Sequence, residues 1–291
     1  MTQSNPQVPW TDEQWARVNQ VIQEEAQRAR VAASFLSLFG PLPADTDFVR
    51  SGDIPYEAPL AIADTDTIKL STLQVKVNLR GAQLADPEMT SALALFRRAA
   101  NVLARLEDAL IFNGQHAADE APEGSPNGSE VKGGQLSVGL LIDPDDGNLR
   151  PGKLSTEQTA VVAADGDSLV KGLTESVGDL EENGHFGPFA VVLASDLFVA
   201  AHEPSAGVNV LPRDRMLPLL EGGSLLRSSL LRSGHGVVVG LGGAPIELVV
   251  ATDMSLQFLQ VTADPRFTFR VYEKVALRIK GKKAFAVLRP A

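Results

Sequence analysis

The sequence predicts a mixed α+β fold for this chain of 291 residues. The first observation is a pair of long segments, Thr11–Ala29 and 87–113, whose apolar residues recur at helical spacing. The second is a set of short runs, between 67 and 79 and between 255 and 288, in which apolar and polar residues alternate as in half-buried strands. Helices and strands that occupy separate parts of a chain favour an α+β architecture.

Composition places the chain among globular proteins and excludes several functions. Hydrophobic residues make up 44% and charged residues 21%, which are ordinary globular values. The net charge of −10 argues against a nucleic-acid partner, because no excess of Lys and Arg can neutralise phosphates. The absence of cysteine excludes disulfides, thiolate metal sites and cysteine nucleophiles. Since the start is not signal-like and no apolar run approaches membrane-spanning length, we expect a cytoplasmic protein with no membrane partner.

The first helix has clear start signals. Thr11 and Gln14 have the spacing of a capping box, and Trp10 and Trp15 occupy the two positions of a hydrophobic staple. Beyond the helix, the sequence AASFLSLF at 32–39 is apolar on nearly every side, so another element or another chain must cover it. Core packing and an interaction surface both remain open for this segment.

The next segment is predicted to be an extended arm. Residues 41–66 are rich in proline and in acidic residues, which favours an excursion away from the core. From Thr67 onward apolar and polar residues alternate, with one slip at Ser71-Thr72 that predicts a bulge in a long strand. A long arm with one apolar face suits contact with a neighbouring subunit better than a compact enzyme.

The segment 87–113 predicts the longest helix, about 40 Å at 1.5 Å per residue. Asp86 suits the N-cap position and Asn113-Gly114 suits the stop. The apolar residues form two neighbouring stripes: Met89, Leu93, Phe96, Ala100, Leu103 and Leu110 in one, and Leu95, Ala99, Val102 and Leu106 in the other. We expect a structural spine, although periodicity alone also fits a core helix of an ordinary enzyme. A long polar loop, 115–159, is expected after it.

The second half of the chain supplies shorter elements. Helices are expected at 167–182, from Asp196 to Ala201, and at 213–221. Strands are expected at 189–193, 237–241 and 246–250, and in the final run 255–288.

The sequence contains no recognisable catalytic constellation. The G-x-x-x-x-G-K-[ST] phosphate loop, the H-E-x-x-H metal helix and the G-x-S-x-G nucleophile elbow are all missing. The four histidines have no ligand-spaced partners, so neither a metal nor a cofactor is expected. Glu107 and Asp108 point about 100° apart on a helix and cannot share a site. We expect them on a solvated or inter-subunit face together with Arg97, Arg98 and Arg105.

Several segments, taken in order, resemble the encapsulin shell proteins, a family that includes linocin-type bacteriocins and is related to tailed-phage capsid proteins. LEDALIFNG at 106–114 resembles their [FL]-E-D-x-x-[IV]-F-x-G signature. NGHFGPFAVVL at 183–193 is similar to their Gly- and Pro-containing segment before a strand, and ATDMSL at 251–256 to their G-Q-D-[LM]-S-[IL] stretch. FTFRV at 267–271 and VALRI at 275–279 are similar to the closing strands. The order and spacing agree over most of the chain.

The resemblance implies a tailed-phage major-capsid-type fold and a function in assembly. It divides the chain into an N-terminal helix (1–40), an extended loop and strand arm (41–80), a peripheral domain with the spine helix (81–168), an axial domain (169–243), and C-terminal strands that return to the peripheral domain (244–291). It implies that sixty or more copies close into an icosahedral nanocompartment. Such a compartment encloses a cargo enzyme, and its shell protein has no catalytic activity of its own.

In this family the cargo carries a C-terminal targeting peptide that docks on the inner wall, near the end of the N-terminal helix. Carried over, the resemblance nominates a peptide-binding set: Phe35, Leu36, Leu38, Phe39, Asp253, Met254 and Leu256. The chain departs from the family at 33–37, where ASFLS stands in place of a basic G-R-[KR]-x-[VI]-D sequence. We therefore expect a less charged dock.

The resemblance also implies a pore at the five-fold axis, lined by the loop Glu203, Pro204, Ser205, Ala206, Gly207, Val208 and Asn209. One carboxylate among small residues predicts a pore for water and small solutes, mildly favouring cations if Glu203 faces inward. A plain surface loop is the alternative. Two other functions stay open for the chain: a prophage major capsid protein that packages DNA, and an uncharacterised hydrolase or bacteriocin-like protein.

Overall fold

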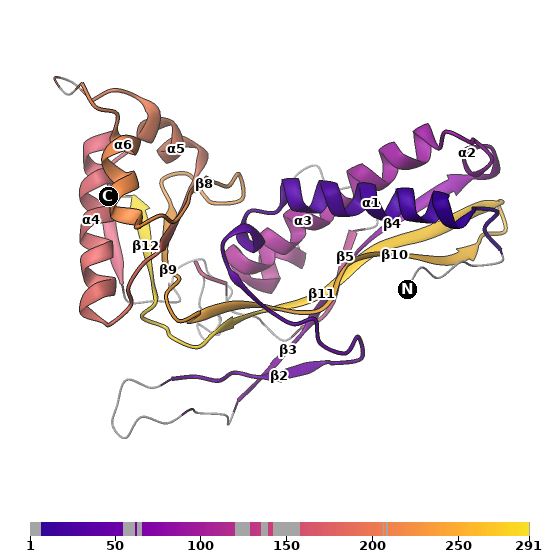
Figure 1. Cartoon of the computed structure of the whole chain (residues 1–291), viewed down its shortest axis with the longest axis horizontal. Coiled ribbons are helices and arrows are strands. Elements are labelled where there is room, and N and C mark those ends of the chain that lie inside the picture. Colours follow the sequence, from indigo (N-terminus) through magenta and orange to yellow (C-terminus); the bar gives the residue numbers. More distant parts are fainter. Residues whose placement is uncertain are drawn as a thin grey trace.

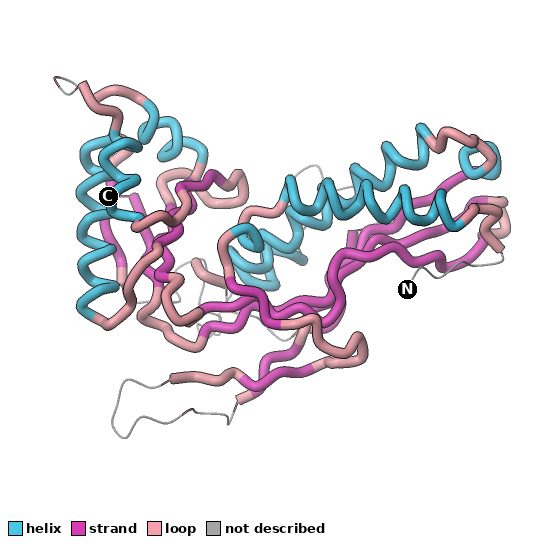
Figure 2. Tube along the Cα trace, in the orientation of Figure 1, coloured by secondary structure: helices cyan, strands magenta, loops and turns pink. Residues whose placement is uncertain are grey.

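The computed structural model contains two five-stranded sheets and a two-stranded ribbon within the residues it describes (Figures 1 and 2). The first sheet has the strand order β1-β10-β11-β4-β5 and the second the order β6-β12-β9-β7-β8. The prediction of a mixed α+β fold is therefore confirmed. The described residues are 7–54, 62, 66–119, 129–134, 139–141, 158–205, 207 and 209–290, with side chains for all of these except 115–119.

The helices are α1 (Asp12–Ala29), α2 (Gly81–Leu84), α3 (Thr90–Asp119), α4 (Gly166–Glu182), α5 (Ser195–His202) and α6 (Pro212–Met216), with short 3-10 turns η1 (Ala32–Ser34) and η2 (Leu217–Leu220). The strands are β1 (Ser37–Phe39), β2 (Phe48–Arg50), β3 (Thr67–Lys69), β4 (Ser71–Arg80), β5 (Ser129–Gly133), β6 (Thr159–Val162), β7 (Phe189–Leu193), β8 (Leu225–Arg227), β9 (Gly236–Gly240), β10 (Ile246–Val261), β11 (Arg266–Ile279) and β12 (Phe285–Pro290).

The two long helices, α1 and α3, lie side by side along one face of the first sheet (Figure 1). The capping box of Thr11 and Gln14 is formed as predicted. The rings of Trp10 and Trp15 meet edge to face with centroids 5.0 Å apart, and Trp10 also stacks on Phe269 of β11 at 5.1 Å. This aromatic group fastens the start of α1 to the sheet.

Helix α3 is the predicted spine, with a later start. Helical backbone begins at Thr90 because Met89 has a φ of 54°, outside the right-handed helical region. Asp86 nevertheless caps the start, since its Oδ2 accepts a hydrogen bond from the Thr90 N–H at 3.1 Å. Gly114, with a φ of 75°, interrupts the helix at the expected stop, and helical turns then continue to Asp119.

The two apolar stripes of α3 face the core. Every stripe residue is buried except Leu95, which is 39% exposed. The stripes pack with α1 and with the inner face of the first sheet in one continuous hydrophobic cluster. The spine therefore has apolar neighbours on two sides, as its sequence predicts.

The arm is shorter than the predicted 41–80. β2 and β3 pair into an antiparallel ribbon that projects from the first sheet (Figure 1). β4 belongs to that sheet instead, between β11 and β5, because its alternate residues Leu73, Val75, Val77 and Leu79 are buried in the core. The expected slip at Ser71-Thr72 is a break between β3 and β4 at the buried Leu70. Residues 55–61 and 63–65 lie outside the described residues.

The described residues of the segment 115–159, which was expected to be loop, include the strand β5. β5 pairs antiparallel with β4, from Ser129 opposite Val75 to Gly133 opposite Ser71. It forms an edge of the first sheet. Most of the remaining segment lies outside the described residues.

Helices α4 and α5 pack on the second sheet, and α6 packs on these two helices (Figure 1). A separate hydrophobic cluster fills the space between that sheet and α4 and α5. β12 pairs antiparallel with β9 of the predicted axial segment and parallel with β6 of the segment 81–168, so the second sheet takes strands from three of the predicted domains. The expectation that all of 244–291 returns to the peripheral domain is thus corrected for β12, because its buried residues Phe285–Leu288 need a sheet covered on both faces.

The helix after β7 begins at Ser195, so Asp196 is not its N-cap. The Oδ2 of Asp196 instead accepts hydrogen bonds from the Ser233 hydroxyl at 2.6 Å and from the Gly234 N–H at 2.7 Å. None of the helices in the described ranges is long and apolar enough to cross a bilayer.

Candidate functional site

The predicted docking residues lie around the end of η1, on β1 and in the middle of β10. β1 pairs in parallel with β10, with Leu38 opposite Leu248 and Phe39 opposite Val249. The chain continues beside β10, because the Leu42 N–H donates to the Val250 carbonyl at 2.9 Å. The fold therefore places Leu38 and Phe39 beside β10, the strand that carries Asp253, Met254 and Leu256.

Leu38 and Phe39 form the exposed apolar part of the set. They are 63% and 39% exposed on β1, which is an edge strand of the first sheet. The guanidinium of Arg278 lies 4.0 Å from the centroid of the Phe39 ring, a cation–π contact. Its Nε donates to Glu247 at 2.8 Å, and Lys280 donates to the same carboxylate at 2.9 Å. Sequence reasoning missed this ionic group, because only the pairing of β10 with β11 brings it together.

The ionisation of Glu247 is favoured by these two partners. Burial alone would raise the pKa of Glu247, but the hydrogen bonds from Lys280 and Arg278 lower it below its usual value. The ionic group beside Phe39 contains two cations and one carboxylate. Leu38 and Phe39 are the exposed apolar members of the predicted set, and as neighbours on a strand they lie on opposite faces of the sheet.

Leu36 and Met254 lie in the core instead of on this surface. They are 4% and 0% exposed, so neither is accessible to a ligand on this protomer. The Met254 carbonyl accepts a hydrogen bond from Gln23 Nε2 at 2.6 Å, which ties β10 to α1. Phe35 and Leu256 are partly buried against the same core.

Asp253, the remaining member of the set, is held by Arg30, which caps the C-terminus of α1. Arg30 Nη1 donates to Asp253 Oδ1 at 3.0 Å, and Arg30 Nε lies 2.6 Å from Glu107 Oε2 of α3. Its third nitrogen donates to Glu273 of β11. Glu107 and Glu273 have no exposed side-chain surface, whereas the Asp253 side chain is 53% exposed. One guanidinium therefore joins α1, α3, β10 and β11.

The prediction that Glu107 and Asp108 lie on a solvated or inter-subunit face is wrong. They are 0% and 2% exposed, because the end of α1 and η1 cover this part of α3. They do diverge around the helix: Glu107 meets Arg30, whereas Asp108 accepts the N–H groups of Val31 and Ala32 at 2.8–3.1 Å. Burial raises the pKa of Asp108 to about 7, against the opposing effect of these N–H groups.

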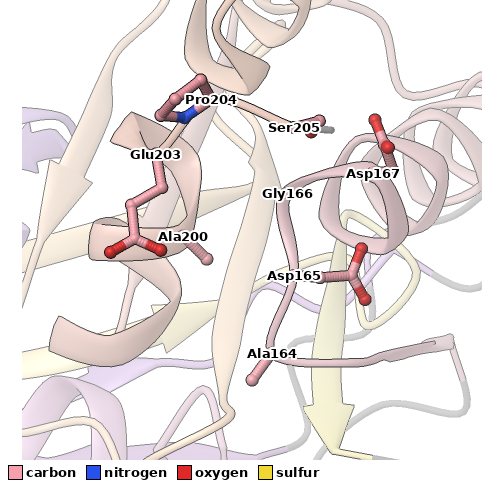
Figure 3. A pocket seen from close by; sticks show the side chains of 8 residues that line it. All are labelled: Ala164, Asp165, Gly166, Asp167, Ala200, Glu203, Pro204 and Ser205. Atoms are coloured by element: carbon pink, nitrogen blue, oxygen red, sulfur yellow. The ribbon is translucent and has the colours of Figure 1, made fainter. Parts of the chain in front are cut away.

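The predicted pore loop begins at Glu203, the exposed C-cap residue of α5. A cavity of about 260 Å³ lies between this loop and the start of α4, lined by Glu203, Asp165 and Asp167 among others (Figure 3). Asp165 caps α4 by accepting the Ser168 N–H at 2.8 Å, and Asp167 is paired with Arg215, whose hydrogen bond lowers the pKa of Asp167. Two of the three carboxylates are thus already held by a backbone N–H group or an arginine. Ala206 and Val208 of the loop lie outside the described residues.

Metal-ligand geometry is not found in the described part of the chain, where no three His, Asp or Glu side chains gather in a way that could hold an ion. His202 lies in the last turn of α5, with Nδ1 2.7 Å from the Phe198 carbonyl. Burial lowers the pKa of His185. Neither histidine lies beside the Leu38 and Phe39 surface.

Comparison with known proteins identifies relatives along nearly the whole sequence. The family model described as an encapsulating protein for peroxidase (Linocin_M18) matches residues 1–121 and 150–276. A type 1 encapsulin shell protein, EncA, of Myxococcus xanthus (strain DK1622) is 29% identical over 301 residues, covering 97% of this chain and 94% of the relative.

Solved structures establish the fold independently. The virus-like particle from Pyrococcus furiosus matches with a TM-score of 0.68 at 13% identity, covering 95% of this chain and all of that one. The capsid of Myoviridae phage XM1 matches with a TM-score of 0.58 at 12% identity, covering 89% and 91%. The predicted tailed-phage capsid-type fold is therefore confirmed. With this fold and a family match over most of its length, the chain belongs to the encapsulin family, whose members are structural shell proteins and not enzymes.

Proposed function

We propose that sixty or more copies of this chain close into an icosahedral shell that encloses a cargo enzyme. Membership of the encapsulin family supports shell formation. Large apolar side chains are exposed at separate places on the protomer, including Phe48 on the projecting ribbon at 54%, Val199 on α5 at 51% and Val210 before α6 at 49%. Repeated contacts between copies would cover such surfaces.

Negative-stain electron microscopy of the purified full chain tests the shell. Uniform hollow spheres are the expected result. Particles filled with DNA would instead support a prophage capsid function, and a monomer or small oligomer would contradict both functions.

The cargo docks, in this proposal, through an extended C-terminal peptide at Leu38 and Phe39. The main support for this docking is that Leu38 and Phe39 are exposed apolar residues on the edge strand β1. An edge strand offers one row of backbone groups to an extended peptide, and apolar side chains beside it accept aliphatic anchors. The description of the matching family names peroxidase, so a peroxidase-type enzyme is the first cargo to test.

Leu38→Asp is expected to reduce cargo loading at least about tenfold while shells still form. Burying a leucine-sized anchor contributes about 1.5–3 kcal/mol, and about 1.4 kcal/mol corresponds to a tenfold change in affinity. The measurement is the ratio of cargo to shell protein in particles purified after co-expression, read from gel densitometry.

Phe186→Asp is the matched control, because Phe186 is 62% exposed, close to the 63% of Leu38, but precedes β7 in the second sheet. Assembled Phe186→Asp particles should load cargo normally. Equal cargo loading of Leu38→Asp and wild-type particles would show that Leu38 is not part of the dock.

The loop at Glu203 lines, in this proposal, a pore that favours cations. The exposed carboxylate of Glu203 supports this, since a carboxylate at a pore attracts cations. Glu203→Lys is expected to slow the entry of small cations into shells severalfold and to speed the entry of anions. Stopped-flow quenching of an encapsulated fluorophore by cationic and anionic quenchers measures both rates.

Glu182→Lys makes the same charge change at the exposed end of α4 and serves as the control. Its particles should match the wild type in both rates. Unchanged rates in Glu203→Lys particles would show that the loop is a plain surface loop.

A further inference from the structure

One guanidinium, that of Arg30, contacts three carboxyl groups where α1 meets the rest of the protomer, and a fourth lies close by. Glu107 and Asp108 approach from α3, Asp253 from β10 and Glu273 from β11. Three of these carboxyl groups are almost completely buried, and only Asp253 reaches solvent. If all four were ionised, the junction would hold a large excess of negative charge away from water, which is costly.

The buried oxygens also lack hydrogen-bond donors. Both carboxylate oxygens of Glu107 and Oε1 of Glu273 have no donor among the described residues. Arg30 Nε is close to Glu107, but its N–H does not have hydrogen-bond geometry toward that oxygen. A proton shared between the two glutamates removes one charge and supplies the missing donor, as in other carboxyl pairs that occupy one site.

We propose that Arg30, Glu107 and Glu273 form a proton-dependent latch that holds the end of α1 against α3 and β11. With the shared proton present, Arg30 balances the one negative charge left on the glutamate pair and the junction stays closed. When the proton leaves, two buried carboxylates repel each other and the junction opens. Asp108 contributes to the same junction by accepting hydrogen bonds from the backbone N–H groups of Val31 and Ala32.

The direction of the pH response follows from the environment of the glutamates. Burial raises the pKa of Glu107 from its ordinary 4.5 to about 7, although Arg30 opposes this, and burial raises the pKa of Glu273 as well. A carboxyl group whose pKa is higher in the folded protein binds its proton more tightly there. Its contribution to folding stability therefore falls as pH rises from about 4.5 through about 7. The latch is closed in mild acid and opens in alkali.

The latch controls the segment that carries the docking surface. Arg30 directly precedes η1 and β1, and β1 holds Leu38 and Phe39. Opening the junction therefore loosens the surface to which the cargo peptide binds. This consequence for cargo rests on the proposed function, whereas the latch itself does not.

Hydrogen–deuterium exchange of assembled full-length shells at pH 6.0 and pH 8.5 tests the latch. Protection of residues 27–39, expressed relative to an unstructured reference peptide at each pH, should fall at least about tenfold at the higher pH, since one pKa unit corresponds to a factor of ten. Glu107→Gln and Glu273→Gln should each keep the protection seen at pH 6.0, because an uncharged amide donor mimics the protonated glutamate. Glu13→Gln, at the exposed start of α1, should respond as the wild type does.

Two results would contradict the latch. One is that the protection of residues 27–39 in the wild type is the same at both pH values. The other is that both glutamine variants lose protection at pH 8.5 as the wild type does. If one variant does not assemble, the other carries the test. Failure of both to assemble would mean that both negative charges are required, which also contradicts the proposal. Cargo release is followed in parallel. If the junction opens while the cargo stays bound, the latch is supported and the proposed dock is contradicted.

Discussion

Leu103→Asp is expected to leave the protein insoluble or unassembled. Leu103 is 0% exposed in the middle of the spine helix α3, within the hydrophobic cluster that α3 shares with α1 and the first sheet. Removing a buried leucine costs about 2–5 kcal/mol of packing, and an unpaired buried carboxyl group adds a further penalty. The sum is comparable with the whole stability of a typical domain, about 5–15 kcal/mol. The soluble fraction after expression and particle counts by electron microscopy measure the outcome.

Ala94→Asp is the control for this substitution, because it adds the same charge on an exposed position of the same helix. Its protein should remain soluble and folded. Intact particles from Leu103→Asp would mean that α3 is not the structural spine of the protomer.

Local signals in the sequence located the helices well. The capping box at Thr11 and Gln14 and the glycine stop at Gly114 are short-range features, and both have the expected geometry. The start of α3 was misplaced by three residues, because the positive φ of Met89 is a backbone detail that no side-chain pattern encodes.

Contacts between distant segments were not predictable in the same way. β4 has the alternation of an exposed arm strand, but pairing with β11 and β5 on both sides makes it an internal strand. Glu107 and Asp108 carried the sequence resemblance, yet their chemistry was misjudged, since Arg30 and Glu273 come from other elements. Of the docking residues, Leu36 and Met254 belong to the core. The resemblance that nominated them does not distinguish core residues from surface residues.

Phe269→Ala is expected to destabilise the junction of α1 with the first sheet by about 3–5 kcal/mol, the usual cost of removing a buried phenylalanine. Phe269 is 0% exposed, and four aromatic rings surround it. Their centroids lie 5.1 Å away for Trp10, 5.3 Å for Phe258, 5.6 Å for Phe96 and 6.2 Å for Trp15. Edge-to-face and stacked pairs of this kind add to the free energy of simple burial. Truncation of this ring thus weakens α1, α3 and β10 contacts at once.

Differential scanning calorimetry at one fixed scan rate measures the effect as a lower unfolding temperature. At about 2 °C per kcal/mol for a chain of this size, the expected shift is roughly 6–10 °C. Phe186→Ala makes the same chemical change at a residue that is 62% exposed, so its unfolding temperature should stay close to that of the wild type. Equal shifts in the two variants would show that the aromatic cluster around Phe269 does not hold α1 to the sheet.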